Sequence, residues 1–545
     1  MAEKRMRKII SALLSLVMIT GVFGGCSASD GADNEINIAL SSSPITVDPQ
    51  LAFDTNAGSV ISFFTSTLYV YNTDHELVPG LAESCDVSDD GLTYTFNLKE
   101  NLRWSDGRPL NAEDFVFGFR RLADPDVASN SVYLITDSCT IKNAIEVNMR
   151  QKPVNELGVS SPDDKTFVVE LENPCPYFMS LITMVNFSPC NEDFYYEVGT
   201  DYADRAENLL YCGPYIMDRY EPIAMQIHFT ENPYYYRADE IKTHGITIQI
   251  VQNTQQAIMC YKSGVVDITS VSGEYAELTE GDPELHVYPQ AYLSYIDFNH
   301  KNSAALQNRN LRLALTKSID RDDIVNNLLR TGYSPMTCIT PPDFYKETDG
   351  TDYSADGSRY DEYTRYDPDE AGRLWELGLS ETGLSSVKLK IVYYSGNAAL
   401  VEALTAQMKK ALRGLDFEFR SVTMKERQRL YMAGEYDMIL INWVADYCDP
   451  TSFLNSFFTD YVPYGYSNDE YDDLILRCDS AEMAKNADER NKLLHKAEDI
   501  LMENAAAIPI CTMGTNYLIH DGVEGFCLSP TGVNFIVTGL SKEVK

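Results

Sequence analysis

Alternating apolar and polar positions divide the amino-terminal third of the chain into short strands and amphipathic helices. Residues 92–98 place an apolar side chain at every second position, which predicts a half-buried strand. Asn111, with Asp114 three residues later, predicts the start of a helix whose apolar residues share one face. These patterns predict a separate α+β region up to about Asn191, and then strands near 215–217, 226–229, 246–250 and 295–299.

Regular alternation of strands and helices begins near residue 389. Apolar runs predict strands at 389–394, 417–422 and 436–442, and amphipathic stretches predict intervening helices at 397–413 and 425–433. Gly414 and Gly434 stand where each helix should end. The order β-α-β-α-β predicts a parallel sheet. Periodicity also predicts helices over 309–329 and 485–503, a strand over 507–512, and a helix beginning at Asp449 and Pro450.

The stretch 436–455 carries the first candidate chemistry. An unbroken apolar run, typical of a buried strand, is followed by Asn442, Trp443, Asp446 and Tyr447. Ligands of open α/β sheets bind beyond the carboxyl ends of strands, so these residues form a candidate site. Two interpretations of Asp446 stay open here. It is either a loop carboxylate that binds nearby backbone, or the counter-ion of a bound cation from which Trp443 and Tyr447 exclude water.

Residues 1–26 predict an exported protein. Four basic residues precede an apolar stretch, 9–22, that is short for a membrane span and typical of a secretory signal. The sequence FGGC at 23–26 resembles a bacterial lipobox, in which Cys26 is lipidated and becomes the mature amino terminus; cleavage near Cys26 without lipid is the alternative. Residues 27–35 are small and polar, as expected of a flexible tether.

Composition narrows the class of protein. A chain of 545 residues predicts two or three domains. Removal of residues 1–25 takes away four basic residues and one acidic residue. The remaining chain has 40 basic and 80 acidic residues and a net charge of −40. So negative a surface argues against binding of nucleic acid and against docking on anionic lipid. Besides Cys26 there are eleven dispersed cysteines without a C-x-x-C pair, which predicts neither a disulfide framework nor a zinc site.

Catalytic motifs are not found. The sequence contains no G-x-S-x-G, H-E-x-x-H, Walker A or G-x-G-x-x-G pattern, and its seven histidines are dispersed. The segment DVSDDG at 86–91 lacks the spacing of a calcium loop and predicts a turn. We therefore predict no metal, no cofactor and no enzyme activity. A secreted hydrolase that uses a pair of the many carboxylates is the alternative from another class.

Seven blocks occur in order across nearly the whole mature chain. They read TVDP at 46–49, PGLAES at 79–84, WSDGRPLNAEDF at 104–115, GPY at 213–215, NPYY at 232–235, RLALTKSIDR at 312–321 and WVADYCDPTSFL at 443–454. Together they resemble the peptide-binding lipoproteins of ABC importers, the oligopeptide/dipeptide family of extracellular solute-binding proteins (family 5). The resemblance implies an α/β fold of the type II periplasmic-binding-protein kind. Two mixed-sheet lobes close on a ligand about a hinge, and an extra α+β domain is inserted.

The domain boundaries that follow from the resemblance are 36–65, 196–299 and 513–545 for lobe I, 66–195 for the inserted domain, and 300–512 for lobe III. The resemblance also implies that Asp446 pairs with the α-ammonium group of a peptide, while backbone groups on both lobes hold its main chain as an added strand. Leu440 and Tyr431 stand where some members carry basic residues that bind the peptide's carboxylate. The implied peptide-binding residues are Asp54, Thr55, Asn442, Trp443, Val444, Ala445, Asp446, Tyr447 and Met513.

The function implied is that of a substrate-binding protein that captures peptides and delivers them to the transmembrane subunits of an ABC permease. It would be a monomer, anchored through Cys26 to the outer face of the bacterial cytoplasmic membrane. A nickel chelate or an oligosaccharide as the ligand, or a peptide that acts as a signal, are the alternatives within the family. Asp446 favours a peptide with a free amine, because a sugar has no cation for it to meet.

Overall fold

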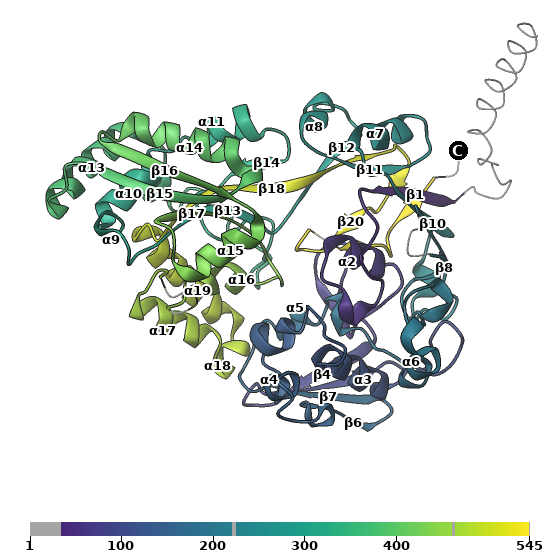
Figure 1. Ribbon diagram of the computed structural model, residues 1–545. Helices are drawn as coiled ribbons and strands as arrows, with labels where there is room; N and C mark the ends of the chain where they lie inside the picture. Colours follow the sequence, from purple (N-terminus) through teal and green to yellow (C-terminus); the bar gives the residue numbers. More distant parts are fainter. Residues whose placement is uncertain (1–33, 221–224, 460, 462–463, 533, 544–545) are drawn as a thin grey trace, which may run out of the picture.

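The computed structural model describes residues 34–220, 225–459, 461, 464–532 and 534–543, and Figure 1 shows them as two large lobes with a third, smaller one below. The predicted signal segment, Cys26 and residues 27–33 of the predicted tether lie outside the described residues. No helix within the described ranges is long and apolar enough to cross a membrane.

One twelve-stranded sheet runs through both large lobes because a single strand, β18 (Ala507–Ile519), belongs to both. The set of strands that pairs with residues 514–519 of β18 is called half-sheet A, and the set that pairs with residues 507–513 is called half-sheet B. Half-sheet A contains β1 (Glu35–Leu40), β8 (Tyr215–Arg219), β9 (Gln226–Glu231), β10 (Gly245–Ile250), β11 (Ile268–Val271) and β12 (Leu285–Pro289). Half-sheet B contains β13 (Tyr292–Phe298), β14 (Tyr333–Pro335), β15 (Val387–Tyr394), β16 (Leu415–Val422) and β17 (Met438–Val444).

Half-sheet B confirms the predicted alternation. β15 pairs in parallel with β16 and with β17, and α14 (Ala398–Ala411) and α15 (Met424–Ala433) connect them. β13 is antiparallel to β17 and to β18, so the sheet is mixed. The predicted end of β17 at residue 442 was wrong. Tyr292 of β13 pairs with Val444, which extends the ladder by two residues and places Asn442 and Trp443 inside the strand.

The single helix predicted over 309–329 was also wrong, because three segments occupy this range. α10 (Arg309–Lys317) ends at Ser318, and α11 (Arg321–Asp323) starts anew with Asp320 as its cap, whose carboxylate accepts a hydrogen bond from the Asp323 amide at 2.9 Å. The backbone then widens into a π-helical segment, Ile324–Leu329. The apolar period continues through all three segments, and for that reason periodicity alone did not reveal the breaks.

The smaller lobe is built on a separate antiparallel sheet with the order β4-β5-β7-β6. Its strands are β4 (Ala82–Val87), β5 (Thr93–Leu98), β6 (Val159–Asp163) and β7 (Thr166–Glu170). α3 (Ala112–Ala123) covers it and begins with the predicted capping box, in which the Asn111 and Asp114 side chains each accept from the other residue's backbone amide. Buried phenylalanines form the core between helix and sheet: Phe96, Phe115, Phe119 and Phe167.

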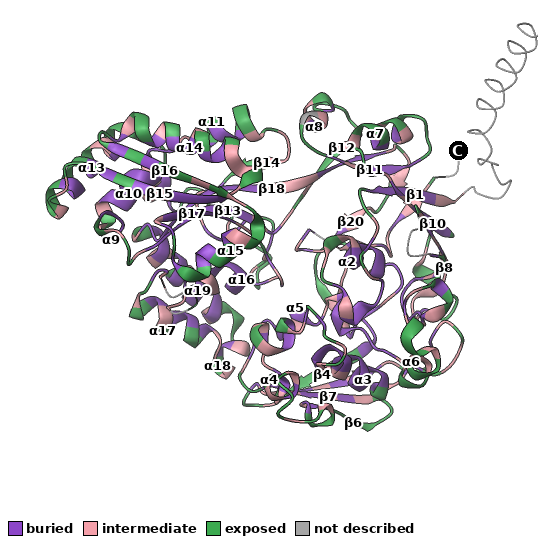
Figure 2. Ribbon diagram, in the orientation of Figure 1, coloured by how far each residue is buried: buried purple, intermediate pink, exposed green. Residues whose placement is uncertain are grey.

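Helices of the large lobes cover the sheet, and Figure 2 shows the buried strands between them. Those of half-sheet B include α13 (Pro368–Thr382), α16 (Thr451–Leu454), α17 (Asp469–Cys478), α18 (Ala481–Ala484) and α19 (Ala487–Glu503). Those near half-sheet A are α2 (Thr55–Ile61), α7 (Thr254–Lys262) and α8 (Glu274–Leu278). A buried ion pair, Arg121 Nη2 to Asp48 Oδ2 at 2.6 Å, joins α3 of the smaller lobe to the segment after β1. The predicted residue boundaries of the three domains stay a prediction.

Candidate functional site

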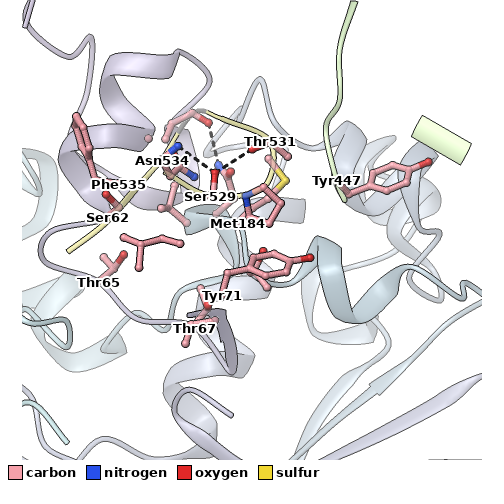
Figure 3. Close-up of a pocket in the computed structure, with 18 of the residues that line it drawn as sticks. Ser62, Thr65, Thr67, Tyr71, Met184, Tyr447, Ser529, Thr531, Asn534 and Phe535 are labelled. Carbon is pink, nitrogen blue, oxygen red and sulfur yellow. Dashed lines mark hydrogen bonds between the residues drawn. The ribbon is translucent and has the colours of Figure 1, made fainter. Parts of the chain in front are cut away.

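A cavity of about 410 Å³ lies where the start of α2, the smaller lobe and the loop after β17 meet (Figure 3). Its walls come from residues 52–67, from residues 180–186 at α5 (Phe178–Leu181), from residues 444–448 and from the carboxyl-terminal segments 529–531 and 534–538. Ser62 and Thr65 lie on one side, Tyr447 lies on the other, and Tyr71 lies between them. Because the walls belong to both large lobes and to the smaller lobe, a change in their separation changes the size of the cavity.

Asp446 lies in the loop directly after β17, and neighbouring hydrogen bonds fix this loop. The Asp446 amide donates to Ser452 Oγ at 3.1 Å, and the indole Nε1 of Trp443 donates to the Ser452 carbonyl at 2.9 Å. The Ala445 amide donates to the Ala291 carbonyl at 2.8 Å. The Asp446 side chain is thereby held at the cavity wall.

The Asp446 carboxylate has a hydrogen-bond donor but no cationic partner in the described part of the chain. Tyr133 donates its hydroxyl to Oδ1 at 3.3 Å. Burial raises the pKa of Asp446 to about 6, and the hydrogen bond from Tyr133 opposes this rise because it favours the charged form. A carboxyl group in this position can accept a proton near neutral pH or pair with a cation that enters the cavity.

The two residues after Asp446 are held by the smaller lobe. The ring of Tyr447 stacks on the ring of Tyr177, with centroids 4.2 Å apart and planes within 5° of parallel. The Cys448 amide donates to Ser180 Oγ at 2.9 Å, and the Tyr71 hydroxyl donates to the same oxygen at 2.9 Å. The loop that carries Asp446 is therefore tied to residues of two lobes.

A buried ion pair supports the far end of this loop. Arg490 of α19 donates through Nη1 and Nη2 to the two carboxylate oxygens of Asp449, at 2.6 and 2.9 Å. Asp449 also accepts from the Thr451 amide at 3.0 Å. The predicted cap at Asp449 was wrong by one residue, because α16 begins at Thr451 and Pro450 takes the capping position. Burial of both charges is compensated by this two-point contact.

The opposite wall begins at Asp54, which caps α2. Its Oδ1 accepts from the Ala57 amide at 3.0 Å, and its Oδ2 is buried with no partner among the residues described. Phe53 is 53% exposed and Val444 is 41% exposed, and both line the cavity. Each large lobe thus presents one apolar side chain and one carboxylate to the same space.

The structure brings six of the nine predicted binding residues to the cavity: Asp54, Thr55, Val444, Ala445, Asp446 and Tyr447. The other three lie outside its lining. Asn442 accepts from Ser294 Oγ at 3.1 Å, Trp443 packs partly against the core of half-sheet B, and Met513 lies in β18 opposite Tyr333. Tyr431, at a position where some family members carry a basic residue, is buried and donates to Asp297 Oδ2 at 2.9 Å.

Other residues of the site have no signal in the sequence. Tyr133 precedes a π-helical segment, Leu134–Ser138, and meets Asp446 from 313 positions away. Ser180 and Tyr71 belong to no motif, and their roles depend on how the smaller lobe is placed. Long-range partners of this kind follow from the tertiary fold and not from a local pattern.

One edge of β17 is available for a further strand. β15 pairs only with Met438 and Ile439 of β17, while β13 pairs along the whole strand on its other side. At Leu440 the carbonyl accepts from Arg427 Nη1 at 3.4 Å. Beyond this point, up to Val444, no described strand pairs with the edge of β17 that faces away from β13.

Comparisons with known proteins agree with this architecture. The dipeptide-binding protein of Lactococcus lactis subsp. cremoris (strain MG1363) is 29% identical over 562 residues, covering 98% of each chain. Listeria monocytogenes OppA bound to peptide has a TM-score of 0.69 at 28% identity and covers 95% of this chain and 100% of its own. The unliganded open form of the murein tripeptide-binding protein MppA has a TM-score of 0.80 at 25% identity, with coverage of 93% and 98%.

A family model matches the central part of the chain. The model described as bacterial extracellular solute-binding proteins, family 5 Middle, matches residues 76–464, which include the whole smaller sheet and β17 with Asp446. This range exceeds half of the chain. The protein therefore belongs to the bacterial extracellular solute-binding proteins of family 5.

Proposed function

We propose that the protein captures peptides in the cavity beside Asp446 and delivers them to an ABC permease. The observation that carries this proposal is the Asp446 carboxylate, which lines a cavity between lobes and has no cationic partner in the described ranges. The relatives named above are a dipeptide-binding protein and an oligopeptide-binding protein with a bound peptide. The α-ammonium group of a peptide is the cation that best fits this chemistry.

The free edge of β17 supplies the second part of the proposal. A peptide with its amino end at Asp446 and its chain antiparallel to β17 would add a strand along residues 441–445. Backbone hydrogen bonds of this kind give affinity without reading side chains. Asp54 and Thr55 approach from the opposite wall, and Phe53 and Val444 offer apolar contact.

Closure of the large lobes about β18 completes the proposed cycle. The link from β12 to β13 and the middle of β18 cross between the two half-sheets, so these are the proposed hinge segments. The higher TM-score to an unliganded open relative than to a peptide-bound one, 0.80 against 0.69, supports the interpretation that this conformation is the open one. Closure would remove water from Asp446 and strengthen its pairing with the ligand.

The cellular setting is part of the same proposal. Lipidation at Cys26 would anchor the protein to the outer face of the cytoplasmic membrane, and the tether after it would let the lobes reach the permease. A solved relative from Bacillus anthracis is described as the substrate-binding domain of an oligopeptide ABC transporter. The protein would act as a monomer and catalyse no reaction, and the domains would have the boundaries predicted above.

Calorimetric titration with peptides tests the function. Native mass spectrometry of the purified protein identifies any peptide that co-purifies, and titration then compares tetra-alanine with N-acetyl-tetra-alanine. We expect the free-amine peptide to bind at least tenfold more tightly. Equal affinity for the two, or binding of neither together with binding of a nickel chelate or an oligosaccharide, would overturn the proposal.

A further inference from the structure

One part of the cavity lining, called the floor, is formed by Ser66, Tyr235 and Arg237. Arg237 Nε is buried and has no hydrogen-bond partner among the described residues. The hydroxyls of Ser66, Tyr235 and Tyr236 interact with one another, and the hydrogen bonds from Tyr235 and Ser66 oppose the rise that burial causes in the pKa of Tyr236. Ser66 is only 5% exposed, yet it lines the cavity together with Tyr235 and Arg237. Folded proteins rarely leave buried polar atoms unpaired, so the unpaired Nε of an arginine that lines a cavity indicates a missing partner.

A close backbone contact builds this floor. The amide of Gly213 donates to the Phe64 carbonyl at 2.9 Å, and a Cβ added at Gly213 would lie 2.5 Å from the Thr65 nitrogen. Only a glycine permits this approach. Asn232 Nδ2 donates to the Gly213 carbonyl at 2.9 Å, which brings the segment after β9 to the same place. Ser66 and Arg237 meet at the cavity for this reason.

The floor is rich in hydrogen-bond donors. Arg237 Nη2 donates to the Tyr235 hydroxyl at 3.3 Å, and the Tyr235 hydroxyl donates in turn to that of Tyr236. The guanidinium lies over the ring of Tyr236, 5.3 Å from its centroid. Among the described residues, Arg237 forms an ion pair only with Glu240, and this pair is long, with Nη1 and Oε2 3.7 Å apart. Arg237 thus retains donors for a second acceptor.

We propose that Arg237, together with Ser66, forms a subsite for a carboxylate of the ligand. This inference rests on the proposed function and names the ligand class, a peptide that carries a carboxylate within reach of the floor. The planar guanidinium offers paired donors that match the two oxygens of a carboxylate. With Asp446 at one wall and Arg237 at the floor, one cavity offers a negative and a positive pole. A ligand with an amine and a carboxylate complements both.

The carboxylate has two possible sources, an acidic side chain or the peptide's own carboxyl terminus, and calorimetry separates them. One arm places Glu at each position of tetra-alanine and compares it with Gln at the same position. The other compares di-, tri- and tetra-alanine with their carboxyl-terminal amides. Both arms are repeated with Arg237→Met, Arg237→Lys and Ser66→Ala. Arg219→Met is the matched control, since Arg219 bonds to Gln226 and lies outside the cavity lining.

We expect one carboxylate-bearing peptide to bind at least tenfold more tightly than its neutral counterpart. Arg237→Met should abolish that difference, Arg237→Lys should retain part of it, and Arg219→Met should leave it unchanged. Glu240→Gln should increase it, because the competing carboxylate is gone. If neutral and acidic peptides bind alike while the free amine is still required, the subsite is refuted and the proposed function stands. If no peptide binds, both are refuted.

Discussion

Tyr133 and Asp446 lie 313 residues apart, and the hydroxyl of the first donates to the carboxylate of the second at 3.3 Å. The contact joins the smaller lobe to the loop after β17, on the wall of the cavity. It occupies one carboxylate oxygen and leaves the other for an incoming cation. Asp446 is therefore held in place by Tyr133, which reduces the reorganisation needed when a ligand binds.

Asp446→Asn should weaken the binding of free-amine peptides by about 100-fold, because removal of one partner of a desolvated charge pair leaves the other unpaired. Calorimetric titration with tetra-alanine measures this loss. Asp137→Asn is the control, since this exposed carboxylate lies outside the cavity lining. An Asp446→Asn variant with undiminished affinity would show that the amine binds elsewhere.

Peptide affinity should fall below about pH 6. The raised pKa of Asp446, about 6, means that the empty site takes up a proton as the pH drops through this value, and the neutral carboxyl group no longer attracts an ammonium group. Above about pH 8 affinity should fall again as the peptide amine loses its proton. Titrations in buffers of different ionisation enthalpy should detect proton release on binding near pH 6. A flat profile from pH 5 to 7 would contradict the assignment.

Tyr133→Phe should move the acid limb of this profile to higher pH. The Tyr133 hydroxyl favours the charged carboxylate, so its removal raises the pKa of Asp446 further above its usual range. Affinity at pH 8 should change little. Tyr71→Phe removes a hydroxyl that bonds to Ser180 and not to Asp446, and it should leave the acid limb in place.

Asp449→Asn should lower the free energy of unfolding by about 3–5 kcal/mol, because it leaves the buried Arg490 guanidinium without its counter-charge. Thermal or urea denaturation measures the change. Lys485→Ala breaks an exposed ion pair with Asp89 and should leave the unfolding free energy nearly unchanged. Equal effects of the two substitutions would refute the structural role given to the buried pair.

Gly514→Ala should destabilise the fold by about 1–3 kcal/mol and weaken peptide binding. Gly514 lies where β18 passes from one half-sheet to the other, and a Cβ there would lie 2.6 Å from the Tyr288 carbonyl oxygen. Gly372→Ala in α13 meets only an ordinary contact at 3.7 Å and should be neutral or stabilising. Denaturation and calorimetry of both variants make the comparison.

Local patterns in the sequence predicted much of the fold. The capping box at Asn111 and the glycine stop at Gly434 were confirmed, because these features depend on residues within a few positions of each other. The stop predicted at Gly414 was wrong, since α14 ends at Ala411 with the extended Leu412 as its cap. The end of β17 was misplaced because its last two residues are held by β13, a strand distant in the sequence. The breaks after α10 were missed because the apolar period carries on across Ser318 and Asp320.

In the candidate site, too, local patterns marked some residues, and only the tertiary fold revealed the others. Asp446 was a candidate because it follows a buried strand. The resemblance of residues 443–454 to a known family then implied that it pairs with the α-ammonium group of a peptide. Tyr133, Ser66 and Arg237 gave no such signal, since their importance depends on which lobes meet at the cavity. Asn442 and Trp443 were predicted, from the family resemblance, to bind through their backbone groups, and this stays a prediction. Their side chains bond within half-sheet B and to Ser452 and do not line the cavity.

The shared strand β18 has a consequence for how the molecule is made. Neither half-sheet is complete without β18, because each pairs with part of this strand. β18 begins at residue 507, 38 residues before the end of the 545-residue chain. A nascent polypeptide that stops short of residue 507 leaves a gap in both halves at once. Truncation before residue 507 should therefore disrupt both lobes together, although most strands of each half-sheet precede that residue.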